Sequence, residues 1–553
     1  MHIISMTVFD WAILAVYLGF VIWIGFYLRR YTKTDEDFFL AGRRNSAMIA
    51  GVAFMSANMG ALEVVGYAGQ GVEYGIYALH FYLIGAIPAM LFLGIFMMPF
   101  YYSGKIKSIP GYLRERFDEK TRVLNAVAFA IMTVLVSGIA LYALALVLRT
   151  FLGWNWDMSI WLSAALVALY VTLSGLMSAI FTEVIQFFLI WAGISLLPIL
   201  GIVDLGGPAQ AFSHLSQMYT HLWANSGNPA DNPMMVSWPA LVFGLGFGIS
   251  FGYWTTDFLI IQRAFSAKDV RSARMAPIIG SYFKILLGFA VVGGGMVGLA
   301  LLKDPHSGFA LLHDGGKIKY DSVMPLLMMR YFPPGVVGIG VTALVAMFMA
   351  GQAGNMSAFN TIWTYDIYQS VINKNASKKH LIWVGRVATV AGILLSIGGA
   401  YWAKNMPTII DYLQAITSWI LAPGVAIILL GMFVKRISPT GAFCGMLVGM
   451  IVSFSLFMAL QLGWISAGAI SPSGGEGMMA ANFWRALWAW LISSGVAVAV
   501  SSFTEKRPEK ELVGLVRSLT PKLAEKDISL YQKPAFWATI TLVILVIINV
   551  YFW

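Results

Sequence analysis

Residues 56–71 have the sequence SANMGALEVVGYAGQG, which places polar and charged side chains in a stretch otherwise apolar enough to cross a membrane. Asn58 and Glu63 need hydrogen-bond partners that lipid cannot supply. Gly60 and Gly66 make an interruption of the helix less costly. If the helix breaks between Asn58 and Gly60, its freed carbonyls and half-helix ends can face a cavity and coordinate a cation or a solute. The pattern therefore predicts a binding site at a broken membrane helix.

A second glycine-rich stretch, GLGFGISFGYWTTDF at 244–258, occurs five spans later and contains Tyr253 and Trp254. Two interrupted spans separated by five helices indicate a pair of five-helix units in inverted orientation. Because five is odd, the second unit starts from the opposite side of the membrane, as an inverted repeat requires.

Ionisable residues inside apolar runs are further candidates, because each costs a few kcal/mol at the bilayer centre. Besides Glu63 they are His80, Glu183, Asp257, Lys284 and Asp366. The positions of Asp257 and Asp366 near cytoplasmic span ends favour structural roles, and Asp257 could pair with Arg263. Glu183, close to a helix start, suits the helix dipole. His80, on an aromatic face, could be either a ligand or a hydrogen-bonded structural residue.

Glu63 and Lys284 both lie well inside their spans. They could form a structural ion pair with each other, or they could line a polar cavity that admits a substrate. The asparagine and glycines around Glu63 favour the cavity, since an interrupted helix supplies further polar groups there.

The composition shows why these few polar residues are informative. The chain of 553 residues is 59% hydrophobic and 11% charged, whereas a soluble globular chain is about 25% charged. We therefore expect an all-α polytopic membrane protein. Apolar runs long enough to cross the bilayer core predict fourteen spans, near 7–29, 46–70, 76–102, 122–149, 157–175, 180–204, 236–262, 275–302, 333–372, 383–403, 407–433, 438–463, 482–502 and 534–553.

The 36 Lys and Arg exceed the 26 Asp and Glu, which could suggest a nucleic-acid partner, but the basic residues cluster in short loops between apolar runs. That distribution is typical of membrane orientation. With the N terminus outside, 28 of the 36 basic residues fall in loops that become cytoplasmic. We expect a multi-pass protein of the cell membrane, surrounded by the lipid bilayer, with both termini outside and neither a nucleic-acid partner nor an obligate protein partner.

Other features exclude several classes of function. Cys444 lies inside an apolar run, so the sequence predicts no disulfide framework and no cysteine metal site. A Walker loop and an HExxH motif are absent from the sequence, and its GxSxG match, GISFG at 248–252, lies inside a glycine-rich apolar run rather than at a strand-to-helix turn. The sequence therefore indicates neither an ATP-driven pump nor a hydrolase. The inner segment 504–533 has the pattern of an amphipathic helix lying at an anionic leaflet.

Several stretches together resemble the sodium:solute symporter family, whose members include the sodium/glucose cotransporters. They run in family order over about residues 5–435, and the fourteen spans and outside termini resemble the bacterial sugar-transporting branch. The matching stretches are DFFLAGRR (37–44), SANMGALEVVG (56–66), SIPGYLRERFD (108–118), LSGLMSAIFTEVIQFF (173–188), GYWTTDFLIIQRAFSAKDVRSAR (252–274), FNTIWTYDIY (359–368) and APGVAIILLGMF (422–433).

The resemblance implies the inverted-repeat fold of the leucine-transporter type and alternating access around a midplane site. A first peripheral helix would occupy 1–30. Spans 2–6 would form the first repeat over 46–204, and spans 7–11 the second over 236–433. Peripheral C-terminal helices would fill 438–553.

The resemblance also implies solute contacts, which by position fall at Asn58, Glu63, His80, Tyr82, Lys284 and Gln414. Tyr253 matches the aromatic inner gate of the family, with Trp254 next to it. An aromatic ring of this kind can stack on a pyranose, which suits a solute with an apolar face.

The sodium site implied by the resemblance departs from the family pattern. Its carbonyl ligands would come from Ser56, Met59 and Met347, but Ala350 and Gly351 occupy the positions of two hydroxyl residues and have no side-chain oxygen. Water or the carboxylate of Glu63 could fill the gap. Glu183 occupies the acidic position on the inner sodium path, which favours continued cation handling.

Three functions fit these observations. The first is a secondary active symporter, driven by Na⁺, for a small polar solute such as a sugar or polyol. The second keeps the fold but makes transport proton-coupled, through Glu63, or uncoupled. The third is a sensor that binds solute without moving it. An enzyme is disfavoured, because no nucleophile–base pair or metal cluster is evident in the sequence.

Overall fold

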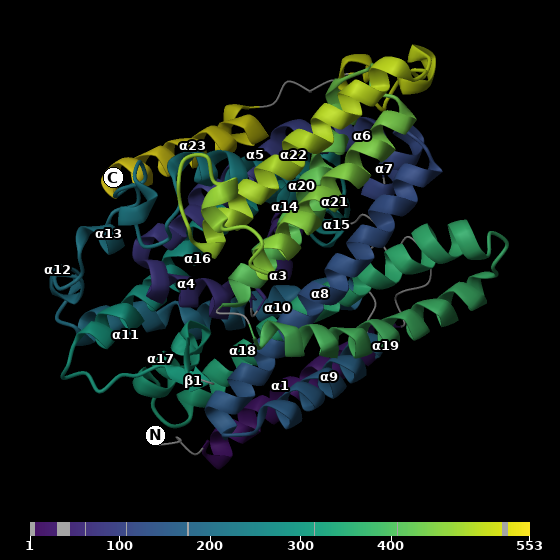
Figure 1. Ribbon diagram of the computed structural model, residues 1–553. Helices are drawn as coiled ribbons and strands as arrows, with labels where there is room; N and C mark the ends of the chain where they lie inside the picture. Colours follow the sequence, from purple (N-terminus) through teal and green to yellow (C-terminus); the bar gives the residue numbers. More distant parts are fainter. Residues whose placement is uncertain are drawn as a thin grey trace.

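A computed structural model describes residues 6–29, 45–60, 62–104, 106, 108–173, 176–314, 316–405, 408–521 and 529–553. The described chain is a bundle of helices with one small hairpin (Figure 1). The longer helices are α1 (Val8–Arg29), α3 (Ala47–Asn58), α8 (Glu119–Leu152), α9 (Trp156–Leu173), α10 (Leu176–Ile194), α16 (Val270–Lys303), α18 (Val336–Thr361), α19 (Lys378–Ala403), α20 (Ile409–Phe433), α21 (Pro439–Gln461), α22 (Met478–Phe503) and α23 (Pro534–Tyr551).

Shorter elements complete the chain. The short α-helices are α4 (Tyr67–Tyr74), α5 (Ile87–Phe92), α6 (Met98–Ser103), α7 (Ile109–Arg116), α11 (Leu196–Asp204), α12 (Pro208–Ala211), α13 (Gln217–Thr220), α14 (Phe251–Thr256), α15 (Phe258–Phe265) and α17 (Val323–Tyr331). The strands β1 (Leu312–Asp314) and β2 (Lys317–Lys319) pair antiparallel in the loop between α16 and α17. Wider π-helical turns cover Leu62–Gly66, Phe81–Ala86, Leu93–Met97, Ala240–Ser250 and Ile362–Ile372.

Polar residues at loop ends begin many of these helices. Ser46, Asp118, Asp269 and Thr408 each accept a hydrogen bond, on a side-chain oxygen, from a backbone N–H in the first turn of the helix that follows. Such caps satisfy N–H groups that have no partner within the helix. The apolar runs then continue the helices through the bundle.

The span with the unusual sequence at residues 56–71 is broken. Helix α3 ends at Asn58, and the next helical segment begins at Leu62, bent by 60° from it. The second glycine-rich stretch is interrupted as well: α14 ends at Thr256, and Asp257 has extended backbone (φ −68°, ψ 116°) before α15 starts. Both interruptions predicted from the glycine-rich stretches are therefore present.

Close backbone packing positions α16 against the broken span. A Cβ atom at Gly295 of α16 would clash with the carbonyl oxygen of Ala68 in α4, and a Cβ at Gly71 would clash with the carbonyl oxygen of Val292. Small residues of this kind let membrane helices approach closely. The contact fixes α16, and with it Lys284, beside the break.

Several of the longer helices form two groups. Helices α1, α9, α18 and α19 lie together on one side, and α20, α21 and α22 lie together on another (Figure 1). Within the described residues, ten helices are long and apolar enough to span a membrane, or eleven if the bent pair counts as one span. Every predicted run coincides with helix, but the count of fourteen stays a prediction.

The prediction of an amphipathic helix over 504–533 is wrong for the described part of that segment. The chain there forms short 3₁₀ turns, at Glu509–Leu512, Arg517–Leu519 and Leu530–Gln532. Pro508 and Pro521 cannot continue a helix, and Gly514 has a positive φ of 83°.

The start of this segment packs on the helices rather than lying on their surface. Leu512 and Val516 are fully buried, and Tyr112 of α7 donates a hydrogen bond to the carbonyl of Leu515 at 3.1 Å. The side chain of Arg517 donates to the carbonyl oxygen of Phe96 at 3.1 Å. The segment therefore packs against α7 and against the helical turn that precedes α6.

Candidate substrate and cation site

A cavity of about 90 Å³ lies at the break between α3 and α4. That volume admits several water molecules. Its walls come from the broken span, the π-helical turn at Phe81–Ala86 that follows it, α8, the interrupted 240–265 region, α16, α18 and α20. The cavity brings together most of the predicted solute contacts and both gate residues, namely Asn58, Glu63, Tyr82, Tyr253, Trp254, Lys284 and Gln414.

Lys284 and Glu63 form a buried ion pair at this cavity, with Nζ 2.6 Å from Oε1. The same ammonium donates a second hydrogen bond to Asn58 Oδ1, also at 2.6 Å. Asn58 in turn donates from Nδ2 to the hydroxyl of Tyr253 at 2.8 Å. Glu63 and Lys284 therefore pair with each other and also line the cavity, whereas the admission of a substrate to this cavity stays a prediction.

Aromatic rings surround the ammonium group of Lys284. Its Nζ lies 4.9 Å from the ring centroid of Tyr82 and 5.1 Å from that of Trp254. Cation–π contacts of this kind favour a desolvated ammonium. Tyr253 packs edge-on against Trp254. The cavity thus combines charged hydrogen-bonding groups with flat apolar surfaces.

Gln414 reaches the cavity from α20, where Thr417 lines it one turn further on. The side chain of Gln414 is 3% exposed. Its Oε1 accepts only a long contact of 3.4 Å from the Thr417 hydroxyl. The amide is therefore available for a solute.

His80 is not among the residues that line this cavity. Its Nε2 lies 2.6 Å from the carbonyl oxygen of Leu222, and its ring packs against Tyr77 and Trp223. The structure therefore gives this histidine the structural role that the sequence left open.

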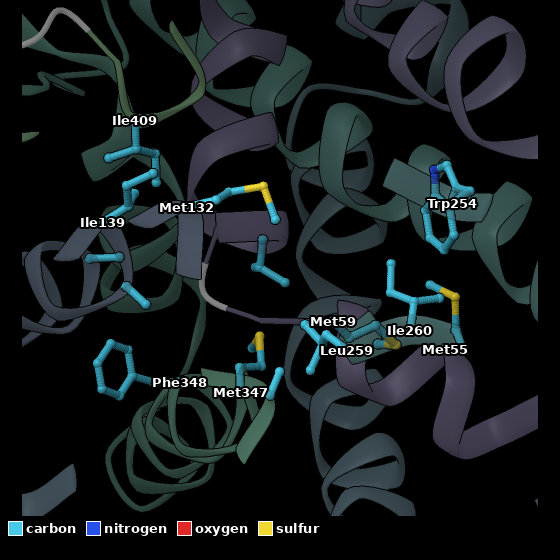
Figure 2. Packing of buried hydrophobic residues seen from close by; sticks show 14 of the residues in the cluster. Met55, Met59, Met132, Ile139, Trp254, Leu259, Ile260, Met347, Phe348 and Ile409 are labelled. Carbon is cyan, nitrogen blue, oxygen red and sulfur yellow. The ribbon is translucent and has the colours of Figure 1, made fainter. Parts of the chain in front are cut away.

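Helix α18 runs beside the break, where the resemblance implies a sodium site. A Cβ at Gly60 would lie 3.7 Å from Gly351 Cα and 3.9 Å from the carbonyl oxygen of Met347. Met59 and Met347 belong to one buried cluster, and Figure 2 shows Met347 and Phe348 on α18 facing the break. Ser56 is fully buried in the last turn of α3.

Two predicted cation residues cannot be placed. The side chains of Ala350 and Glu183 lie outside the described residues, although their backbones belong to α18 and α10. Within the described part of the chain, no three His, Cys, Asp or Glu side chains are grouped so that they could hold a metal ion. A cation here would depend mainly on carbonyl and neutral oxygens.

Some lining residues were missed from the sequence. Thr133 of α8, Ser250, and Asn355 of α18 all line the cavity. The available signal was a polar residue on one face of an apolar run, and single Ser, Thr or Asn residues of that kind more often serve helix contacts.

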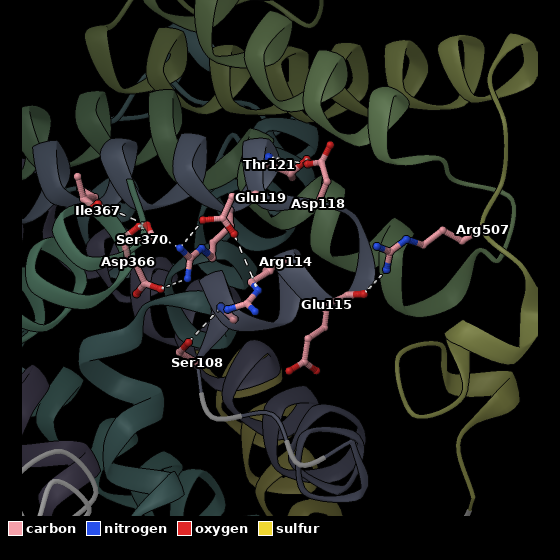
Figure 3. Close-up of polar contacts among 12 residues, drawn as sticks. Ser108, Arg114, Glu115, Asp118, Glu119, Thr121, Asp366, Ile367, Ser370 and Arg507 are labelled. Atoms are coloured by element: carbon pink, nitrogen blue, oxygen red, sulfur yellow. Dashed lines mark hydrogen bonds and ion pairs between the residues drawn. The ribbon is translucent and has the colours of Figure 1, made fainter. Parts of the chain in front are cut away.

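A network of charges joins α8 to the π-helical segment Ile362–Ile372 that follows α18. Arg122 forms ion pairs with Glu119 and, at 3.4 Å, with Asp366 (Figure 3). Arg507 donates from its guanidinium to the carbonyl of Glu115. Asp366 is therefore in a structural pair, as its position in the sequence predicted.

A separate cluster of acidic residues lies where α4 meets the start of α20. Asp321, just before α17, accepts a hydrogen bond from the backbone N–H of Ile409 at 3.2 Å. Burial raises the pKa of Asp321 to about 8, and the neighbouring carboxylate of Asp411 adds to this, whereas the Ile409 N–H and Lys319 act in the opposite direction. Gln70 donates to Thr408 at 3.0 Å, which donates to Asp411 at 2.9 Å.

A broken span that opens on a buried polar cavity, within a bundle of apolar helices, defines a multi-pass membrane transporter. The chain belongs to the sodium:solute symporter family, whose family model matches residues 38–449. The family consists of transporters rather than enzymes, and membership supports Na⁺ as the coupling ion.

Individual relatives are similar over most of their length. The chain is 27% identical to mouse sodium/glucose cotransporter 4, covering 93% of this chain and 78% of that protein. It is 27% identical to the human sodium/myo-inositol cotransporter, covering 80% of this chain and 66% of that protein. A solved Na⁺-coupled sialic acid symporter in a substrate-bound outward-open state has the same fold, with a TM-score of 0.71 at 20% identity over 90% of this chain and 99% of that one.

Proposed function

We propose that this protein couples the inward movement of Na⁺ to the uptake of a small polyhydroxylated solute, a sugar or a polyol, by alternating access. The observation that carries the proposal is the buried Lys284–Glu63 pair at the break, which lines the cavity together with Asn58 and Gln414. Charge-assisted donors and acceptors side by side suit hydroxyl groups, which both donate and accept. The glucose and myo-inositol relatives support this class of solute.

The aromatic residues fit the same class. The flat faces of Tyr82, Tyr253 and Trp254 can cover the apolar face of a sugar ring while the polar groups bind its hydroxyls. In this proposal Tyr253 and Trp254 close the cavity on the inner side. The carbonyls of Ser56, Met59 and Met347 then provide oxygens for Na⁺ beside the break.

The architecture we propose has fourteen spans and two inverted repeats, over 46–204 and 236–433. Peripheral helices lie at 1–30 and 438–553, with both termini outside the cell membrane. The two interrupted spans, at Asn58–Leu62 and at Asp257, support the repeat because they occupy its corresponding first helices.

Uptake into proteoliposomes tests the proposal. Purified protein is given labelled hexoses and polyols with an inward Na⁺ gradient, an inward H⁺ gradient, or neither. Accumulation of a sugar or polyol only with the Na⁺ gradient is the expected result. Accumulation with H⁺ alone, or equilibration in every condition, would replace Na⁺ coupling with proton coupling or facilitated diffusion.

A further inference from the structure

The cavity is also lined by two polar residues that the solute contacts do not use. Asp257 and Asn355 both line it, together with Gly60 and Gly351 at the break. Asp257 is 4% exposed and Asn355 is 7% exposed. Buried polar side chains need partners, so the bonds of each residue decide what this part of the cavity can hold.

Asn355 has no hydrogen-bond partner among the residues that the structure describes, although its side chain faces the cavity. It lies four residues after Gly351 on α18, and therefore about one turn away on the same helix face. Its amide oxygen is available to a ligand in the cavity.

Asp257 keeps one carboxylate oxygen available in a similar way. Its Oδ1 accepts a hydrogen bond from the backbone N–H of Leu259 at 2.9 Å and so begins α15. Its other oxygen accepts none from the described residues. Arg263 attracts this carboxylate, but the Nη1 of Arg263 donates to the carbonyl of Leu259 at 2.6 Å.

Packing brings the segments that carry Asp257 and Asn355 into contact. The side chain of Leu259, two residues after Asp257, fills the space where a Cβ at Gly354 would lie, directly beside Asn355 in the chain. On the other side, Gly60 approaches Gly351 to within van der Waals contact. The turn at Asp257 and the turn at Asn355 therefore flank the backbone of the broken span.

We propose that the coupling Na⁺ is held in the cavity beside the break, by the carboxylate of Asp257 and the amide oxygen of Asn355, with carbonyl oxygens freed at the break. The inference rests on the proposed function. The ligand set consists only of oxygens and carries one negative charge, which suits a hard monovalent cation. It also supplies oxygen ligands that Ala350 and Gly351 do not, one turn further along α18.

Variants of Asn355 and Asp257 test the site through the Na⁺ dependence of uptake. Asn355→Ala and Asp257→Asn are expected to raise the Na⁺ concentration for half-maximal uptake at least tenfold. The apparent KM for the solute at saturating Na⁺ should change less than twofold. Asn355→Asp, which adds a second carboxylate, is expected to lower the half-maximal Na⁺ concentration. Half-maximal Na⁺ values within twofold of the wild-type value in all three variants would overturn the proposal.

Substitutions at Gly351 test whether an added oxygen ligand restores the Na⁺ affinity that Asn355→Ala removes. A Cβ there meets Gly60 Cα at 3.5 Å, an ordinary contact, so a serine fits and places a hydroxyl beside the break. In the Asn355→Ala background, Gly351→Ser is expected to lower the Na⁺ concentration for half-maximal uptake at least fivefold. Gly351→Ala adds the same Cβ without the oxygen and should recover none. Equal recovery by both variants would show that packing, not cation ligation, is responsible.

Na⁺-driven uptake by the wild-type protein distinguishes a failure of this inference from a failure of the function on which it rests. Absence of Na⁺-driven uptake by wild-type protein would overturn the proposed function itself. Na⁺-driven uptake by wild-type protein with unchanged Na⁺ affinity in the variants would overturn only the assigned site. Binding of ²²Na⁺ to purified protein in detergent provides the same comparison for any variant that is folded but does not transport.

Discussion

Lys284 of α16 and Glu63 of the broken span meet as an ion pair of 2.6 Å, although 221 residues separate them in the chain. Both side chains are at most 5% exposed. Taking two such charges out of water is costly, and their attraction offsets that cost only when the geometry is good and further hydrogen bonds are made. The Asn58 contact and the aromatic rings around Lys284 meet this condition, and the pair therefore fixes how α16 sits against the break.

Removing one partner of this pair should abolish transport. Glu63→Gln leaves the ammonium of Lys284 without its counter-charge, and Lys284→Ala leaves the carboxylate. Each variant is expected to lower uptake at least 100-fold while folded protein remains in the membrane. Breaking a buried pair costs about 3–5 kcal/mol of stability, so the melting temperature should fall as well. Uptake by purified variants in liposomes, with circular dichroism to check folding, measures both effects.

A double variant separates stability from binding. Glu63→Gln combined with Lys284→Met removes both charges and should recover most of the lost melting temperature without recovering uptake. Wild-type uptake rates in the single variants would remove these two residues from the binding site.

The hydroxyl of Tyr253 should contribute less than its ring. Tyr253→Phe removes the acceptor of the Asn58 hydrogen bond, and one such bond contributes about 1 kcal/mol, or about fivefold in the apparent KM for the solute. Tyr253→Ala also removes the ring that would cover the solute and should lower uptake much further. Concentration series of labelled solute, at one saturating Na⁺ concentration, give both values. Equal effects of the two substitutions would contradict a gating role for the ring.

The sequence predicted much of the cavity lining because a broken membrane helix is marked by polar residues and glycines close together in an apolar run. Asn58, Gly60 and Glu63 together in an apolar run indicated the interruption that α3 and α4 show. The sequence offered Lys284 as a possible partner of Glu63 but could not decide that the two pair, because the pairing depends on the packing of α16 against α4. For the same reason His80 was a candidate contact, since its partner Leu222 lies in a loop 142 residues away. Segment 504–533 was mistaken for a helix because its charge pattern outweighed the helix-breaking effect of its proline and glycine residues.

His80 should matter for stability rather than for transport. His80→Phe keeps the ring packing against Tyr77 and Trp223 but leaves the carbonyl of Leu222 without its partner. A buried polar group left unsatisfied costs about 1–3 kcal/mol. The free energy of unfolding in detergent should fall by that amount, with the apparent KM for the solute unchanged within twofold. A large rise in KM would return this histidine to the list of solute contacts.

The stability of the protein should depend on pH through Asp321, which lies outside the membrane-spanning helices. Its pKa is about 8 in the folded protein and about 3.9 in an unfolded chain. Between these values the folded state binds the proton that the unfolded state releases. Stability is therefore greatest below about pH 4 for this group and is lost as pH rises through 8.

Asp321→Asn removes this contribution, because asparagine does not titrate and can still accept the hydrogen bond from Ile409. Melting temperatures of wild-type protein and variant in detergent, at pH 5.5, 7.0 and 8.5, measure the effect. The wild-type melting temperature should fall more steeply with rising pH than that of the variant. The remaining slope of the variant should come from other titrating groups. Parallel curves would mean that Asp321 is already ionised in the folded protein, with Lys319 as its compensating charge.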